Sequence, residues 1–317
     1  MIQIFNNDKE RTLHQTPFEL ITDQFDFSNH WVHLSNPTDK EIELISRLCA
    51  IPEEMIKAAL DEEERPRIET EENITLTITD IPIIEEDDDR YTYSTLPFGF
   101  IVTDKLVVTV CINDTTLIND FIFGRVKNVS INKRTRFLLQ FLYRVSTKYL
   151  QYLKQIDKTS QRIQAELEKS MKNKELIEML ELETSLVYFS TSLRSNTVVL
   201  DKLPKVTDFY EEDKDLWEDV GIENRQAIEM CNIYRDILSG TMDAYASLIS
   251  NNLNIVMKVL TLITIMIAVP SMIAAFWGMN TGVPWEGKPY GFWIVIGISL
   301  VLCIVTGVIM FKKKMFK

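Results

Sequence analysis

The sequence lacks the residue patterns of metal-bound, disulfide-linked and secreted proteins. Its four cysteines, Cys49, Cys111, Cys231 and Cys303, are widely separated, with no CxxC pair and no neighbouring histidine cluster. Zinc sites and disulfide frameworks need closely spaced partners, so we expect reduced, buried thiols. The opening residues MIQIFNNDKE have neither a basic segment nor an apolar one, so no signal peptide is predicted and the N-terminus is expected in the cytoplasm. No constellation typical of catalysis appears, so an enzyme is not expected.

Charge is also absent from one part of the chain. The net charge is -12, yet no charged residue lies between Lys258 and Glu286, and the first 250 residues carry almost all of the charged side chains. Uninterrupted apolar sequence follows residue 258. The chain therefore consists of two parts adapted to two different solvents.

Two stretches after residue 258 are long enough to cross a membrane. At 1.5 Å per residue, Val259 to Trp277 spans a hydrocarbon core of about 30 Å, and residues 292–311 form a second span. Tryptophans near the ends of the spans and the basic tail KKKMFK favour a transmembrane hairpin with both ends in the cytoplasm. The intervening loop, which contains Glu286, is then expected outside the cell membrane.

The rest of the chain reads as a sheet domain followed by long helices. Residues 30–50 predict a strand, a helix start at Thr38 and an amphipathic helix; residues 52–64 predict a second helix, and residues 73–84 alternate as a half-buried strand does. Two long antiparallel helices are predicted after residue 133. The predicted divisions are residues 1–130 (cytoplasmic α/β sheet domain), 131–258 (long cytoplasmic helices including a stalk), 259–279 (first transmembrane helix), 280–291 (external loop), 292–311 (second transmembrane helix) and 312–317 (basic cytoplasmic tail).

No proline occurs between Pro204 and Pro270, and apolar side chains recur there at steps of three or four. Sixty-odd helical residues would extend roughly 90 to 100 Å. A bundle helix broken at Gly221 or Gly240 is the alternative. We favour a continuous stalk helix that packs against copies of itself and runs directly into the membrane.

One face of the first span is almost entirely small or polar. At 100° per residue, seven positions fall within a sector of about 80°. They are Asn254, Met257, Thr261, Thr264, Ala268, Ser271 and Ala275. Small residues and hydroxyls are common where transmembrane helices pack closely, and the same stripe also suits a wall facing water. Two spans per chain cannot enclose a pore, so a pore needs several copies around an axis.

The stretch GMNTG then interrupts the apolar sequence. Non-helical backbone near a membrane mouth is tolerated where it meets protein or water. A ring of Asn280 side chains would present neutral oxygen donors, which suit a hydrated Mg²⁺ that keeps most of its waters.

At these residues the sequence resembles the CorA family of divalent-cation channels, over the whole chain. The matching parts are Gly278-Met279-Asn280, the family's GMN signature, the stretch SLISNNLNIVMKVLT before it, the ending FKKKMFK, and WVHLSNPT and LDEEERPRIE in the first domain. The resemblance implies a homopentameric funnel in the cell membrane, with the first span lining a pore for Mg²⁺ and also Co²⁺ or Ni²⁺.

The resemblance also implies roles for single residues. Gly278, Met279 and Asn280 would form the selectivity ring, Asn254 an inner ring, and Met257 with Leu260 a hydrophobic constriction. A regulatory Mg²⁺ between subunits would bind Asp219, with Asp61 and Glu62 as the nearest partner acids. The expected partners are other copies of the chain, the bilayer and divalent cations, with no nucleic acid and no organic cofactor. A Zn²⁺ transporter of the ZntB-like branch and a non-conducting membrane-anchored cation sensor are the alternatives.

Overall fold

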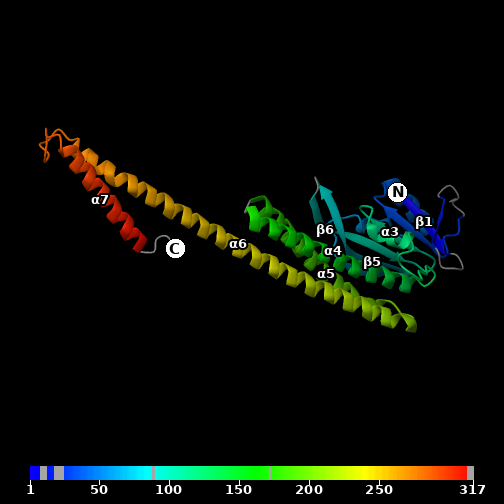
Figure 1. The fold of residues 1–317 in the computed structure, drawn as a ribbon. Coiled ribbons are helices and arrows are strands. Elements are labelled where there is room, and N and C mark those ends of the chain that lie inside the picture. The colour runs from blue at the N-terminus through cyan, green and yellow to red at the C-terminus, as the bar shows by residue number, and fades with distance from the viewer. Residues whose placement is uncertain (8–12, 18–24, 88–89, 171–172, 313–317) are drawn as a thin grey trace. The chain divides into compact units, whose positions relative to one another are not determined.

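The computed structural model describes residues 1–7, 13–17, 25–87, 90–170 and 173–312 (Figure 1). The predicted basic tail therefore lies outside the described residues except for Lys312. The chain divides into two compact units, Met1–Gly240 and Thr241–Lys317. The first unit thus takes in the sheet together with the long helices that follow it, and each unit is described by itself below.

A seven-stranded sheet forms the centre of the first unit, in the order β2-β1-β3-β7-β6-β5-β4. The strands are β1 (Ile2–Asn7), β2 (Leu13–Thr16), β3 (His30–Ser35), β4 (Arg67–Glu71), β5 (Ile74–Asp87), β6 (Arg90–Val102) and β7 (Val107–Cys111). The pair β3 and β7 is parallel, whereas the other neighbouring pairs are antiparallel. A tight turn at Thr103, whose N–H donates to the carbonyl oxygen of Leu106 at 3.1 Å, joins β6 to β7.

Two short helices cover one face of this sheet. Helix α1 (Asp39–Cys49) begins as predicted at Thr38, whose hydroxyl accepts from the Glu41 N–H while the Glu41 carboxylate accepts from the Thr38 N–H. Its Ile42 and Ile45 join the core under the sheet. Helix α2 (Glu53–Ala58) is shorter than the predicted helix to residue 64, because turns replace it from Ala59 onward.

Aromatic side chains fill the opposite face, beneath helices α3 (Thr116–Ile122), α4 (Arg134–Ser170) and α5 (Asn173–Val206). The ring of Trp31 on β3 lies 5.2 Å from that of Phe137 on α4, and Phe98 on β6 stacks on Phe141 at 4.4 Å. The first unit is therefore a sheet with helices on both faces, which confirms the predicted α/β domain.

Helices on both faces also explain one wrong prediction. The alternation along residues 73–84 indicated a strand with one solvated face, but Thr77 and Thr79 on that face are 0% and 2% exposed. Threonine tolerates this burial because its methyl group packs well on a pleated surface. The period of the sequence identified the strand, whereas the covering by α4 and α5 decided its burial.

A buried carboxylate ties α3 to α4. The side chain of Asp120 is fully buried and lies 2.9 Å from the guanidinium of Arg125, 2.6 Å from that of Arg144 and 3.2 Å from the Lys148 ammonium. These hydrogen bonds and charges outweigh the effect of burial and lower the pKa of Asp120. Three cations around one acid hold the two helices together.

Helix α6 (Lys214–Trp277) follows the short 3-10 turn η2 (Glu211–Asp213) and is continuous through Gly221 and Gly240, as predicted. Within the first unit it packs on α5, since Cys231 Sγ lies 3.1 Å from the Leu186 carbonyl oxygen and the Asn224 amide donates to Thr197 Oγ1 at 2.9 Å. This part of α6 therefore packs on its own chain, and its packing against copies of itself stays a prediction. Its own chain already buries Ala227 and Leu238.

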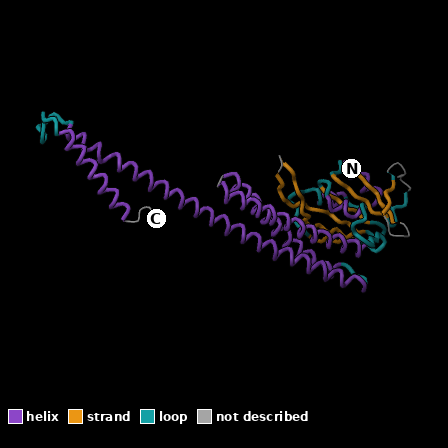
Figure 2. The backbone as a smooth tube through the Cα atoms, viewed as in Figure 1, coloured by secondary structure: helices purple, strands orange, loops and turns teal. Residues whose placement is uncertain are grey.

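The second unit consists of the end of α6, a loop and helix α7 (Gly291–Lys312) (Figure 2). Windows within these two helices have mean hydropathies of 2.3 and 2.7, and both helices are long and apolar enough to cross a membrane. Their apolar side chains are exposed, as expected when the surrounding solvent is lipid. The predicted pair of apolar spans is thereby confirmed in length and composition.

Candidate functional site

The small and polar stripe of α6 remains uncovered within the second unit. All seven of its residues are exposed, and so is Leu260 at its edge; the seven are Asn254, Met257, Thr261, Thr264, Ala268, Ser271 and Ala275. Helix α7 contacts a different face, where Cys303 Sγ lies 3.6 Å from the Met266 carbonyl oxygen and Ile273 is only 6% exposed. The stripe is therefore not the contact surface between the two spans of one chain. The stripe is thus left to contact another copy, water or lipid.

The hydroxyl groups of the stripe point their oxygen lone pairs outward. Thr261, Thr264 and Ser271 donate hydrogen bonds of 2.8 to 2.9 Å to backbone carbonyls one turn earlier. Because each proton is used inside the helix, the hydroxyl oxygens are left as acceptors. Acceptors suit the water shell of a hydrated cation, which presents hydrogens outward.

The GMN turn begins where α6 ends. The Gly278 N–H donates to the Ala274 carbonyl oxygen at 2.9 Å, and the helix ends at Trp277, two residues before the predicted position 279. A Cβ atom at Gly278 would lie 3.3 Å from that same carbonyl oxygen, so a larger residue would crowd the helix end. Met279 and Asn280 are exposed. The Asn280 amide makes no hydrogen bond to any residue that the structure describes, so its oxygen is available to a ligand.

The loop after the turn folds back onto the helix end. The indole N–H of Trp277 donates to the Pro284 carbonyl oxygen at 3.2 Å, and the rings of Trp277 and Trp285 stack 6.3 Å apart. Trp285 has φ 63°, a left-handed conformation that costs a non-glycine residue energy and indicates that its surroundings hold it. The predicted external-loop acid, Glu286, is exposed beside this stack.

The predicted regulatory acids are exposed but separate. Asp61 accepts the Glu63 N–H at 3.0 Å in a turn after α2, next to Glu62, whereas Asp219 lies on α6. Among the described residues, no three acidic, histidine or cysteine side chains form a group that could hold a metal ion. A single copy of the chain therefore does not assemble this site, and its composition remains a prediction.

The sequence did not indicate two acidic residues, Glu223 on α6 and Asp80 on β5. Glu223 lies one helical turn after Asp219; burial, and then the charges of these two acids, raise the pKa of Tyr143 on α4. On β5, burial raises the pKa of Asp80 to about 6. A helical repeat could have indicated Glu223, but nothing in the stretch TITD indicates that Asp80 is covered by α5.

Comparisons with known proteins match this architecture. The model of the family described as CorA-like Mg2+ transporter protein matches residues 28–313. The Cobalt/magnesium transport protein CorA of Methanocaldococcus jannaschii is 28% identical over 301 residues, which cover 89% of this chain and 91% of that protein. The Magnesium transport protein CorA of Campylobacter jejuni is 24% identical, with 99% of both chains covered.

Solved structures agree with the sequence matches. The complete structure of the CorA magnesium transporter from Methanocaldococcus jannaschii has a TM-score of 0.79 at 25% identity, covering 98% of this chain and 97% of that chain. The cytoplasmic domain of ZntB from Vibrio parahaemolyticus, at a TM-score of 0.58 and 12% identity over 79% of this chain and 96% of that chain, shares the fold alone. A family match over most of the sequence, together with two apolar helices, assigns the chain to a class of membrane ion transporters rather than enzymes. The chain belongs to the CorA-like Mg²⁺ transporter family.

Proposed function

We propose that this protein is a homopentameric channel of the cell membrane for Mg²⁺ influx, with both termini in the cytoplasm. The observation that carries this proposal is the stripe on α6, which α7 leaves uncovered and which leads directly to the GMN turn. Five such stripes facing a common axis would line a pore with small side chains and acceptor oxygens. Co²⁺ and Ni²⁺ are the other divalent ions that we expect it to pass.

Selection would take place at rings of Gly278, Met279 and Asn280. The free Asn280 amide offers a neutral oxygen, which can accept hydrogen bonds from the waters that Mg²⁺ releases reluctantly. Asn254 would repeat this chemistry at the inner end. Glu286, in the loop outside, would raise the local cation concentration.

Influx requires no chemical fuel. A divalent ion moving down an inside-negative potential gains roughly 4.6 kcal/mol per 100 mV, twice the value for a single charge. The gate would be a constriction at Met257 and Leu260, whose side chains are 51% and 55% exposed and thus available to meet their copies around an axis. An apolar ring closes a pore by excluding water.

Regulation would come from Mg²⁺ bound between neighbouring subunits by Asp219 on one side and Asp61 or Glu62 on the other. Their exposure in the single chain leaves these carboxylates free to face another copy. At high cytoplasmic Mg²⁺ the bridged acids would hold the subunits together. At low Mg²⁺ their repulsion would loosen the stalks and widen the constriction.

The test of conduction is Mg²⁺ flux into proteoliposomes that contain a Mg²⁺-sensitive dye, with Zn²⁺ in parallel and with an imposed potential. We expect potential-driven Mg²⁺ influx that Asn280→Ala abolishes or makes unselective. The control Asn252→Ala removes an amide from the opposite face of α6 and should conduct normally. Zn²⁺ influx driven by a pH gradient would instead identify a Zn²⁺ transporter, and no flux of either ion would identify a sensor.

The regulatory acids need a separate experiment. We expect Asp219→Ala to shift the internal Mg²⁺ concentration that closes the channel, because one side of the bridge is lost. The matched variant Asp236→Ala removes an exposed acid elsewhere on α6 and should leave closure unchanged. Identical closure curves for both variants would contradict this site while leaving conduction intact.

A further inference from the structure

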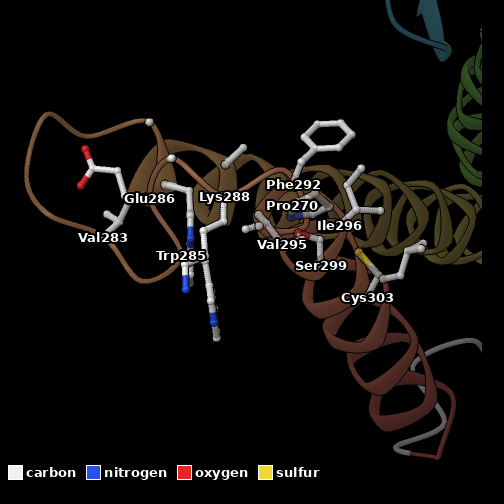
Figure 3. A pocket seen from close by; sticks show the side chains of 16 residues that line it. Pro270, Val283, Trp285, Glu286, Lys288, Phe292, Val295, Ile296, Ser299 and Cys303 are labelled. Carbon is white, nitrogen blue, oxygen red and sulfur yellow. The ribbon is translucent and has the colours of Figure 1, made fainter.

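An apolar hollow of about 750 Å³ lies between the end of α6, the loop after it and the start of α7 (Figure 3). This volume is within the range of about 300–1,000 Å³ that is typical of small-molecule sites. Its walls include Pro270, Trp277, Val283, Phe292, Val295 and Leu300. Such a hollow takes an apolar ligand.

The hollow is distinct from the conduction stripe. Neither the seven stripe residues nor Leu260 lines it, whereas Ala274 on α6, Gly278 in the GMN turn and Ser299 on α7 do. An ion on the stripe would therefore not occupy the hollow. Since both helices that form it are candidate membrane spans, the molecules that reach it are membrane components.

Two charged residues at its rim indicate the kind of head group. Lys288 and Glu286 both line the hollow, and the Lys288 ammonium lies 5.6 Å from the centre of the Tyr290 ring. Among the described residues no carboxylate forms an ion pair with Lys288, so its ammonium is available to a phosphate. The neighbouring Glu286 carboxylate disfavours a head group with net negative charge.

We propose that this hollow binds one acyl chain of a zwitterionic phospholipid, with the lipid phosphate on Lys288. The apolar walls exclude a free phosphate or nucleotide, and the rim lysine favours a phospholipid over an uncharged lipid. Trp277 and Trp285, which line the hollow, support a position at the membrane surface, where the lipid phosphates lie. Tryptophan is enriched at this boundary between lipid and water.

A lipid in this position would touch the residue where the GMN turn begins. Gly278 lines the hollow and has no side chain, so the acyl chain would pack directly on its backbone. The lipid would then restrain the turn two residues before the ligand-accessible Asn280. This inference concerns a lipid site and does not depend on conduction, so the two can fail separately.

Fluorescence quenching by brominated acyl chains measures occupancy directly. Trp277 and Trp285 lie in the hollow, and Trp293, which is 71% exposed on α7, is removed by Trp293→Phe so that bulk lipid does not dominate the signal. Trp31 and Trp217 belong to the first unit and provide a constant background. In bilayers of brominated phosphatidylcholine, we expect strong quenching of the remaining signal.

Matched variants separate the hollow from the general lipid surface. Ser299→Phe places a ring in the hollow and should remove most of the quenching. Val301→Phe adds the same ring at an α7 position that is 59% exposed and does not line the hollow, and should leave quenching unchanged. Brominated diacylglycerol, which has no phosphate, should quench less than the brominated phospholipid. Lys288→Ala should abolish this difference between the two lipids. The control Lys258→Ala should leave the difference unchanged.

Three results would overturn the proposal. Absent quenching would mean that protein, such as a second copy of the chain, occupies the hollow. Equal quenching in Ser299→Phe and Val301→Phe would mean that the signal comes from the general lipid surface and not from the hollow. Equal quenching by phospholipid and diacylglycerol in the parent protein would refute the assignment of the phosphate to Lys288.

Discussion

The two units of the chain place their apolar side chains in opposite ways. In the first unit, Trp31 and Phe137 are fully buried, whereas in the second unit Ile267 and Ile304 are each 63% exposed. The first unit must withdraw apolar surface from water and builds a dense core to do so. The second unit needs no such core, because lipid is as apolar as its side chains.

Polar groups differ between the units in the same way. In the first unit they form long-range networks, such as Asp120 with three cations or the Trp31 indole donating to Thr109 Oγ1 at 2.8 Å. In the second unit the hydroxyls of Thr261 and Thr264 bond to carbonyls of their own helix. Without water, each helix must satisfy its polar groups internally. Substitutions should therefore affect stability in the first unit and transport in the second.

The largest expected effect is the loss of a core aromatic. The centre of the Phe137 ring lies 5.2 Å from that of Trp31 and 5.5 Å from that of Phe100. Phe137→Ala should lower the free energy of unfolding of the first unit by about 3–5 kcal/mol. Hydrogen exchange of the β7 amides would measure this loss. Phe276→Ala, at a position in α6 that is 54% exposed, should leave exchange in both units nearly unchanged. Similar losses of stability in Phe137→Ala and Phe276→Ala would contradict the difference in apolar burial between the two units.

A substitution at Asp80 is expected to raise the stability of the first unit, in contrast to Phe137→Ala. Its folded-state pKa of about 6 lies above the unfolded value of 3.8, so the folded state binds the proton more tightly. Stability then falls as the pH rises from about 4 to 6 and levels off above. Asp80→Asn should remove this decline and stabilise the first unit by at most about 3 kcal/mol at pH 7.5.

Hydrogen exchange of the β5 amides at pH 5 and pH 7.5 measures the effect at Asp80. The control Asp201→Asn removes one negative charge from an exposed position of α5. A stability gain for Asp80→Asn that is equal at both pH values would contradict the assignment to its titration.

A smaller loss is expected at the start of α1. Thr38→Ala removes the hydroxyl that caps the helix and should cost about 1 kcal/mol, seen as faster exchange of the α1 amides. The same substitution at Thr191, an exposed residue inside α5, should be neutral or slightly stabilising because alanine is the better helix former. An equal loss of helix stability in Thr38→Ala and Thr191→Ala would indicate that the lost cap is not the cause of the faster exchange.

The smallest effect on stability is expected in the second unit. Thr264→Val keeps the shape of the side chain and removes a hydroxyl that bonds to Leu260 of the same helix, so exchange of the α6 amides should not change. Mg²⁺ flux should fall, because the stripe loses an acceptor oxygen. Thr306→Val makes the same change on α7, outside the stripe, and should conduct normally. Unchanged flux in Thr264→Val would remove this residue from the pore.

Local patterns predicted the elements well, and contacts between elements poorly. The apolar spans and the Thr38 cap follow from neighbouring residues, and the structure contains both. The end of α2 and the burial of Thr77 were predicted wrongly. Both depend on what packs against the element, which residues nearby in the sequence do not reveal.

The sequence by itself determined which parts of this protein are adapted to water and to lipid, where the long helices run, and which face of the first span is small and polar. These properties depend on composition and on the period of a helix or strand, so a short window contains them. Only the tertiary structure decided the parallel pairing of β3 with β7, the convergence of Arg125, Arg144 and Lys148 on Asp120, and the face of α6 that α7 covers. Each of these depends on residues far apart in the chain, whose meeting is set by packing rather than by local preference.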